Sequence, residues 1–128
     1  MAILAIDLGL KRIGLAFSPD NKIALLLNPI IRKNRDQAAN EVKRIIADRN
    51  VDFIVLGLPL GGNAEDEMKR RGKHFINLLD FADKFAFQDE SDSSIEAAEL
   101  LQTKDKRDGK LDSIAALVIL NRYLSKRS

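Results

Sequence analysis

The stretch 2–18 reads AILAIDLGLKRIGLAFS and holds two short apolar runs on either side of a glycine. Ala2–Asp7 and Arg12–Ser18 each have the length and composition of a β-strand. Gly9 lies in the connection between them and can adopt the positive φ that tight turns often need. The stretch therefore predicts an antiparallel hairpin at the start of the fold.

The rest of the chain alternates between helical and strand patterns. Ala38, Val42 and Ile45 recur at helical spacing, whereas the continuous apolar run Phe53–Gly57 is typical of a strand covered on both faces and placed centrally in a sheet. The further expected elements are a strand 23–27 after the turn 18–21, a helix 34–49, a helix capped by Asn63 with Met68, Phe75, Leu79 and Ala82 on its apolar face, a strand 85–88, a helix 93–101 and a helix 111–124. Apart from one additional short helix, the order is βββαβαβα, which predicts an α/β fold with a mixed five-stranded sheet and helices on both faces.

Composition narrows the class of protein. The chain has 128 residues, 45% of them hydrophobic and 31% charged, so we expect one globular domain spanning 1–128. It has no cysteine and only His74 as histidine, which excludes thiolate metal sites and a histidine-clustered metal site. No apolar run approaches the roughly 18 residues of a membrane helix, and the N-terminus lacks a signal-peptide core. These features predict a soluble cytoplasmic protein with no membrane partner.

The first strand carries an unusual carboxylate. The alternation Ile3, Ala5, Asp7 places an aspartate on a face that is otherwise apolar. Because burying an unpaired charge costs several kcal/mol, Asp7 needs a donor, a basic side chain or a metal ion as its partner. The structural alternative is an aspartate at the end of a strand that accepts backbone hydrogen bonds in the following turn.

Acidic residues at two more places fall where such a site would form. Asp89 and Glu90 directly follow the last strand, so one of them should lie at the carboxyl end of that strand. Asp112 begins the very apolar final helix. Three carboxylates at one end of a sheet are ligands that Mg²⁺ or Mn²⁺ accepts together with phosphate oxygens. The alternative reading is that Asp89 or Glu90 caps the next helix and Asp112 only complements a helix N-terminus.

Basic residues flank these acidic positions. Residues 87–103 contain five acidic and no basic side chains, whereas 104–128 contain seven basic and three acidic ones. An acidic site beside basic tracts suits a phosphate-bearing polymer, although such runs are often only solvated helix faces. The candidate nucleic-acid-binding residues are Lys11, Arg12, Lys106 and Arg107.

Four segments resemble the YqgF/RuvX family, whose members are named as pre-16S rRNA nucleases or Holliday junction resolvases. They are the segments AIDLGLKRIG (5–14), VLGLPL (55–60), DE (89–90) and LDSIAALVIL (111–120). The resemblance covers nearly the whole chain and implies an RNase H-like fold. It also implies a nuclease dependent on Mg²⁺ or Mn²⁺ and acting in 5′-end processing of pre-16S rRNA, on the RNA itself or on ribosomal precursor particles. Residue by residue, it makes Asp7, Glu90 and Asp112 the catalytic and metal-binding carboxylates.

Two alternatives remain open at this stage. A Holliday junction resolvase would use the same carboxylates on branched DNA and would form a two-fold dimer, so a monomer and a homodimer are both expected states. A non-catalytic nucleic-acid- or ribosome-binding module is favoured by one departure from the family. After Asp-Glu the family usually continues with Arg-Leu-Thr, but this chain has Ser91-Asp92-Ser93, which lacks a guanidinium for phosphate.

Overall fold

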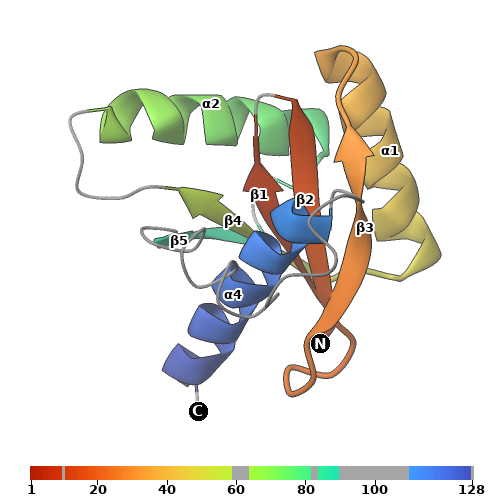
Figure 1. The fold of residues 1–128 in the computed structure, drawn as a ribbon, viewed down its shortest axis with the longest axis vertical. Helices are drawn as coiled ribbons and strands as arrows, with labels where there is room; N and C mark the ends of the chain where they lie inside the picture. The colour runs from red at the N-terminus through yellow and green to blue at the C-terminus, as the bar shows by residue number, and fades with distance from the viewer. Residues whose placement is uncertain (10, 59–63, 82–83, 90–109, 128) are drawn as a thin grey trace.

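The computed structural model describes residues 1–9, 11–58, 64–81, 84–89 and 110–127, without the side chains of 110–112 and 127. Its elements are β1 (Ile3–Leu8), β2 (Arg12–Ser18), β3 (Leu25–Ile31), α1 (Arg35–Asp48), β4 (Phe53–Leu58), α2 (Glu65–Leu78), β5 (Phe85–Asp89) and α4 (Lys110–Arg127). The five strands form one sheet in the order β3-β2-β1-β4-β5. Strand β1 is antiparallel to β2 and parallel to β4 (Figure 1), which confirms the mixed sheet. Strand β1 is central, and β4 lies beside it as an internal strand.

The opening hairpin forms as expected, but its glycine is needed for a different reason. The φ angle of Gly9 lies outside the positive range, so that part of the prediction is wrong. Instead, its N–H donates to the carbonyl oxygen of Arg12 at 3.1 Å. A Cβ atom on Gly9 would lie 2.4 Å from that oxygen, so close approach of two backbone segments requires glycine here.

The third strand begins later than the sequence predicts. The side chain of Asp20 accepts hydrogen bonds from the backbone N–H groups of Lys22 and Ile23, at 2.9 and 3.0 Å. These bonds extend the turn through Ile23, so the strand runs over Leu25–Ile31 and not 23–27. Pro29 is compatible with this strand because β3 lies at the edge of the sheet.

The first helix starts at a capping box that the spacing of its apolar residues does not reveal. The side chain of Asn34 accepts from the backbone N–H of Gln37, whose side chain in turn accepts from the backbone of Asn34. The N-cap of α2 is Ala64, with no side-chain cap, and not the expected Asn63. Asn63, Ala82 and the expected helix 93–101 lie outside the described residues.

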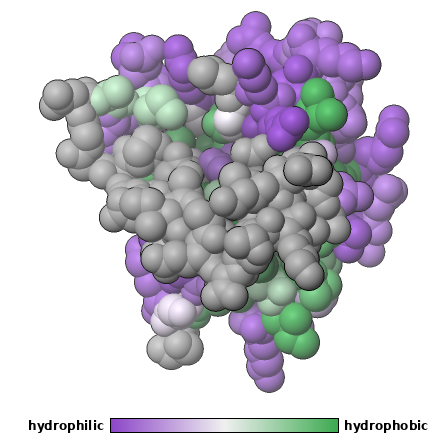
Figure 2. Space-filling view, viewed as in Figure 1, coloured by the Kyte–Doolittle hydropathy of each residue, from purple (hydrophilic) through white to green (hydrophobic). Residues whose placement is uncertain are grey.

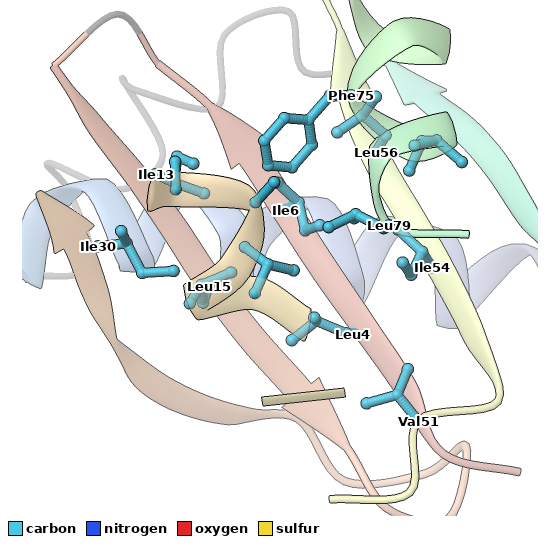
Figure 3. Close-up of a cluster of buried hydrophobic side chains, with 14 of the residues drawn as sticks. Leu4, Ile6, Ile13, Leu15, Ile30, Val51, Ile54, Leu56, Phe75 and Leu79 are labelled. Carbon is cyan, nitrogen blue, oxygen red and sulfur yellow. The ribbon is translucent and has the colours of Figure 1, made fainter. Parts of the chain in front are cut away.

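Helices cover both faces of the sheet, as expected. On one face, α1 and α2 pack against a large core, where Ile6 and Leu56 meet Phe75 (Figure 3). On the other face, α4 crosses the sheet (Figure 1) and contributes Ala116 and Ile119 to a second core. The second core also contains Ile3, Ala5, Ala16, Val55 and Leu120. Within the described ranges, no helix is both long and apolar enough to span a lipid bilayer.

The buried face of α2 approaches the sheet very closely. Phe75 and Leu79 are buried as predicted and Met68 is half-buried. Gly72 is buried as well, and a Cβ atom there would lie 2.6 Å from Cδ2 of Leu56 and 3.2 Å from the ring of Phe87. Gly72 therefore sets the distance between α2 and strands β4 and β5.

Candidate metal and nucleic-acid site

Asp7 lies near the carboxyl end of the central strand, between two glycines. It pairs with Gly14 of β2 and with Gly57 of β4. Its side chain alternates with those of Leu4 and Ile6, which belong to the α1–α2 core, so it faces the α4 side of the sheet. The residue is half-buried. Because neither flanking residue has a side chain, the carboxylate has no cross-strand side chain directly beside it on this face.

The same row of the sheet contains a second polar side chain, that of Gln88. Gly57 pairs with Gln88 of β5, so the row runs Gly14, Asp7, Gly57, Gln88; we call it the Asp7 row. Phe87 packs into the α1–α2 core, so Gln88 faces the opposite side, as Asp7 does. Gln88 is only 3% exposed, and its Oε1 has no hydrogen-bond partner among the described residues.

Helix α4 is tied to the sheet on both sides of this row. Near its start, the buried hydroxyl of Ser113 accepts a hydrogen bond from the N–H of Leu15 at 3.3 Å. In its second half, Arg122 donates from Nη1 to the carbonyl oxygen of Asp89 at 3.1 Å. Leu15 follows Gly14, and Asp89 follows Gln88, so the two hydrogen bonds fix α4 across the Asp7 row.

The structure brings two of the three predicted carboxylate positions to one region. Asp7 lies on the predicted face, and the backbone of Asp112 lies in the first turn of α4, beside Ser113. The side chain of Asp112 is outside the described part of the chain, and so is the whole of Glu90. The described residues contain no group of three acidic or histidine side chains that could hold a metal, but they include only one of the three predicted ligand side chains.

Basic residues gather at the end of the sheet where β1 finishes, close to Asp7. Lys11 and Arg12 are exposed in the turn after β1 and at the start of β2. Arg32 holds this turn, because its Nη1 donates to the carbonyl oxygen of Gly9 at 2.8 Å and its N–H donates to the carbonyl oxygen of Lys11 at 2.9 Å. With the exposed Lys33, these residues form what we call the basic edge: Lys11, Arg12, Arg32 and Lys33. Hydrophilic residues also gather over the α1 and α2 side of the molecule (Figure 2).

The other two predicted nucleic-acid-binding residues, Lys106 and Arg107, lie outside the described residues. Sequence reasoning missed Gln88, Ser113 and Arg122 as residues of this region. Gln88 had a detectable signal, since it is a polar residue alternating with two phenylalanines in the strand 85–89. The hydrogen bonds of Ser113 and Arg122 depend on the packing of α4, which no local pattern specifies.

The side-chain oxygen atoms of the Asp7 row are of the kind that binds a hard divalent cation. The described oxygen donors are the carboxylate of Asp7 and the amide oxygen of Gln88. Mg²⁺ and Mn²⁺ prefer carboxylate and carbonyl oxygens, whereas softer metals prefer sulfur or imidazole. The residues present therefore fit the metal that the sequence analysis predicts.

Comparison with known proteins identifies the family. The family model described as "RuvX: Holliday junction resolvase" matches residues 1–126. A protein of Sulfurimonas denitrificans is 51% identical over 99% of both chains, and one of Campylobacter lari is 53% identical over 96% of this chain and 97% of its own. Both are named "Putative pre-16S rRNA nuclease".

Solved structures support the fold. Thermus thermophilus RuvC in complex with a Holliday junction substrate superimposes with a TM-score of 0.61 at 12% identity, covering 99% of this chain and 96% of RuvC. Fowlpox virus resolvase in complex with Holliday junction DNA gives a TM-score of 0.58 at 18% identity, covering 99% of both chains. These likenesses concern the fold alone, which is the RNase H-like fold that RuvC-type resolvases share. From the match over residues 1–126 and the relatives at 51% and 53% identity, the chain belongs to the RuvX Holliday junction resolvase family.

Proposed function

We propose that this protein is a divalent-metal-dependent nuclease that hydrolyses phosphodiester bonds of pre-16S rRNA during 5′-end processing. The observation that carries the proposal is the position of Asp7 on the α4 face, flanked by two glycines and next to the basic edge. The names of the relatives at 51% and 53% identity support RNA as the substrate. The proposed location is the cytoplasm.

The proposed metal ligands and catalytic residues are Asp7, Glu90 and Asp112. Together, the three carboxylates would hold the Mg²⁺ or Mn²⁺ ions on which the reaction depends. Such cations supply an activated water molecule and stabilise the leaving oxygen of a phosphodiester. The hydrogen bonds of Ser113 and Arg122 support this assignment, because Ser113 directly follows Asp112 and Arg122 binds the residue before Glu90.

The basic edge would bind the substrate backbone. The exposed Lys11 and Arg12 lie on the turn that follows β1, so a phosphate they neutralise would lie close to Asp7. Arg32 would act as a positioning residue, since it holds the carbonyl oxygens of Gly9 and Lys11. Lys106 and Arg107 are proposed for the same phosphate-binding role.

The experiment compares cleavage of an end-labelled pre-16S rRNA 5′ leader and a matched four-way DNA junction with Mg²⁺, Mn²⁺ or EDTA. Wild type, Asp7→Asn and the control Asp48→Asn, an exposed aspartate at the end of α1, are assayed together. Loss of an outer-shell partner of a metal ligand already costs roughly 10–100-fold, so Asp7→Asn should lower metal-dependent cleavage by at least about 100-fold. Asp48→Asn should cleave like wild type. A folded Asp7→Asn protein that retains full cleavage would contradict the assignment.

A second candidate function is cleavage of branched DNA. It is favoured by the description of the matching family and by the fold likeness to two resolvases in complex with Holliday junctions. Paired symmetric cuts need two sites, so this function requires a two-fold dimer. Cleavage of the junction but not of the RNA leader, by a protein that sediments as a dimer, would replace our proposal. Salt-sensitive binding without any cleavage would instead support the non-catalytic module.

A further inference from the structure

One buried polar atom of the Asp7 row has no hydrogen-bond partner among the described residues. Three buried side-chain oxygens lack a hydrogen-bond partner within the described ranges, those of Ser18, Asn21 and Gln88. Ser18 pairs with Ile3, at the opposite end of β1 from Asp7, and Asn21 follows β2 at that same end. Gln88 alone of the three lies on the Asp7 row. Unpaired buried polar atoms are rare and destabilising, so a ligand that binds the amide oxygen of Gln88 would stabilise the protein.

The strand register places Gln88 on the same face of the sheet as Asp7. Asp7 and Gln88 project from the same face, with only Gly57 between them. Two strand spacings separate their Cα atoms by about 10 Å, a gap that the two side chains can bridge together with one cation. The amide nitrogen of Gln88 donates to the carbonyl oxygen of Asp89 at 3.5 Å, which leaves the oxygen as the atom available for a ligand.

We infer that Gln88 contributes its Oε1 as a neutral ligand to the divalent cation at Asp7. The inference rests on the proposed function, which assigns a cation to Asp7. Amide carbonyl oxygens belong to the ligand set of hard divalent cations, so the donor type fits. A neutral ligand adds no repulsion to a site already rich in carboxylates. Binding a cation would also satisfy the one polar atom of Gln88 that the described residues leave unpaired.

The test measures Mn²⁺ binding to the full chain by titration calorimetry and by the electron paramagnetic resonance spectrum of the bound ion. It compares wild type, Asp7→Asn, Gln88→Met, Gln88→Glu and Ser18→Ala. Methionine keeps the length and apolar character needed at a buried position while removing the oxygen, so Gln88→Met should weaken Mn²⁺ binding roughly 10-fold or more. Gln88→Glu adds a charged oxygen and should tighten binding. Ser18→Ala removes another buried unpartnered oxygen at the far end of the sheet and should bind as wild type does.

The outcomes separate this inference from the proposed function. If Asp7→Asn abolishes Mn²⁺ binding but Gln88→Met and Gln88→Glu both bind as wild type does, the inference is overturned and the proposed nuclease site stands. If wild type binds no Mn²⁺, both are overturned. Circular dichroism checks the fold of each variant. If Gln88→Met fails to fold, the Glu variant decides, because an unchanged affinity and an unchanged spectrum would overturn the inference.

Discussion

Replacing Gly72 with alanine tests how rigidly α2 is seated on the strands that carry Gly57 and Gln88. The change improves the helix propensity of α2, because alanine is favoured over glycine by about 1 kcal/mol in a helix interior. It also places a methyl group 2.6 Å from Cδ2 of Leu56 and 3.2 Å from the ring of Phe87. The two effects have opposite signs, so their magnitudes decide the result.

The steric effect should prevail. Carbon atoms in contact lie about 3.5–4.0 Å apart, so Leu56 would have to move by roughly 1 Å. Leu56 is fully buried, which leaves it little room, and overpacking of this kind costs roughly 1–3 kcal/mol. The expected net loss in the free energy of unfolding is about 1 kcal/mol. With an unfolding entropy of about 2.1 cal/mol/K per residue, this lowers the Tm of 128 residues by about 4 °C.

Thermal and urea unfolding of a small set of variants checks this value. Lys73→Ala, an exposed neighbour in α2, serves as the control and should change stability by less than about 0.5 kcal/mol. Leu56→Val removes the atom that the new methyl group meets, so the two substitutions together should cost less than the sum of their separate effects, by about 1 kcal/mol. A Gly72→Ala protein that melts above wild type would refute the reasoning, because helix propensity would then outweigh the close contact.

Three further changes follow from single contacts. Ser113→Ala removes the acceptor of the Leu15 N–H and should cost about 1–2 kcal/mol in urea unfolding; an unchanged midpoint would show that the hydrogen bond is not needed. Asn34→Ala breaks the capping box of α1 and should lower stability by about 1 kcal/mol, whereas equal melting of variant and wild type would contradict the cap's contribution. Hydrogen bonds from the backbone N–H groups of Ile23 and, to a smaller extent, Lys22 lower the pKa of Asp20 below 3.8. The stabilisation from Asp20 is therefore present above its unfolded pKa and is lost as the pH falls through the lowered value, so Asp20→Asn should flatten the acid limb of the stability profile. An NMR titration midpoint at or above 3.8 for Asp20 would count against this.

Local patterns predicted most of the fold because its elements are set by short-range periodicity. The hairpin and strand β4 follow from their short apolar runs, and α1 follows from the helical spacing of its apolar residues. The start of β3 did not follow, because the side chain of Asp20 accepts hydrogen bonds from two backbone N–H groups, which extend the turn and move the start of the strand by two residues. The prediction of Asn63 as the N-cap of α2 was also wrong, because the N-cap is Ala64, which has no capping side chain.

The candidate site was predictable only in part, because some of its residues are brought together by contacts between distant parts of the chain. Alternation along one strand is enough to place Asp7 on the α4 face. The Asp7 row, in contrast, depends on the register between strands that lie about 50 and 80 residues further along the chain. No local pattern specifies that Gly57 falls beside Asp7 or that Gln88 follows it. Glu90 and the side chain of Asp112 remain predictions.

The position of α4 in the chain has a consequence for the protein's synthesis. Helix α4 covers the face of the sheet to which Ile3, Ala5 and Val55 belong, yet it follows all five strands in sequence. While the chain is still emerging from the ribosome, α4 does not yet cover this apolar face, and Asp112 and Arg122 have not yet reached the sheet. Because a domain folds as a unit, the α4 face of the first strand can be buried against α4 only after that last helix has been synthesised. A nascent chain stalled before residue 110 should therefore bind chaperones through this face and lack a complete candidate site.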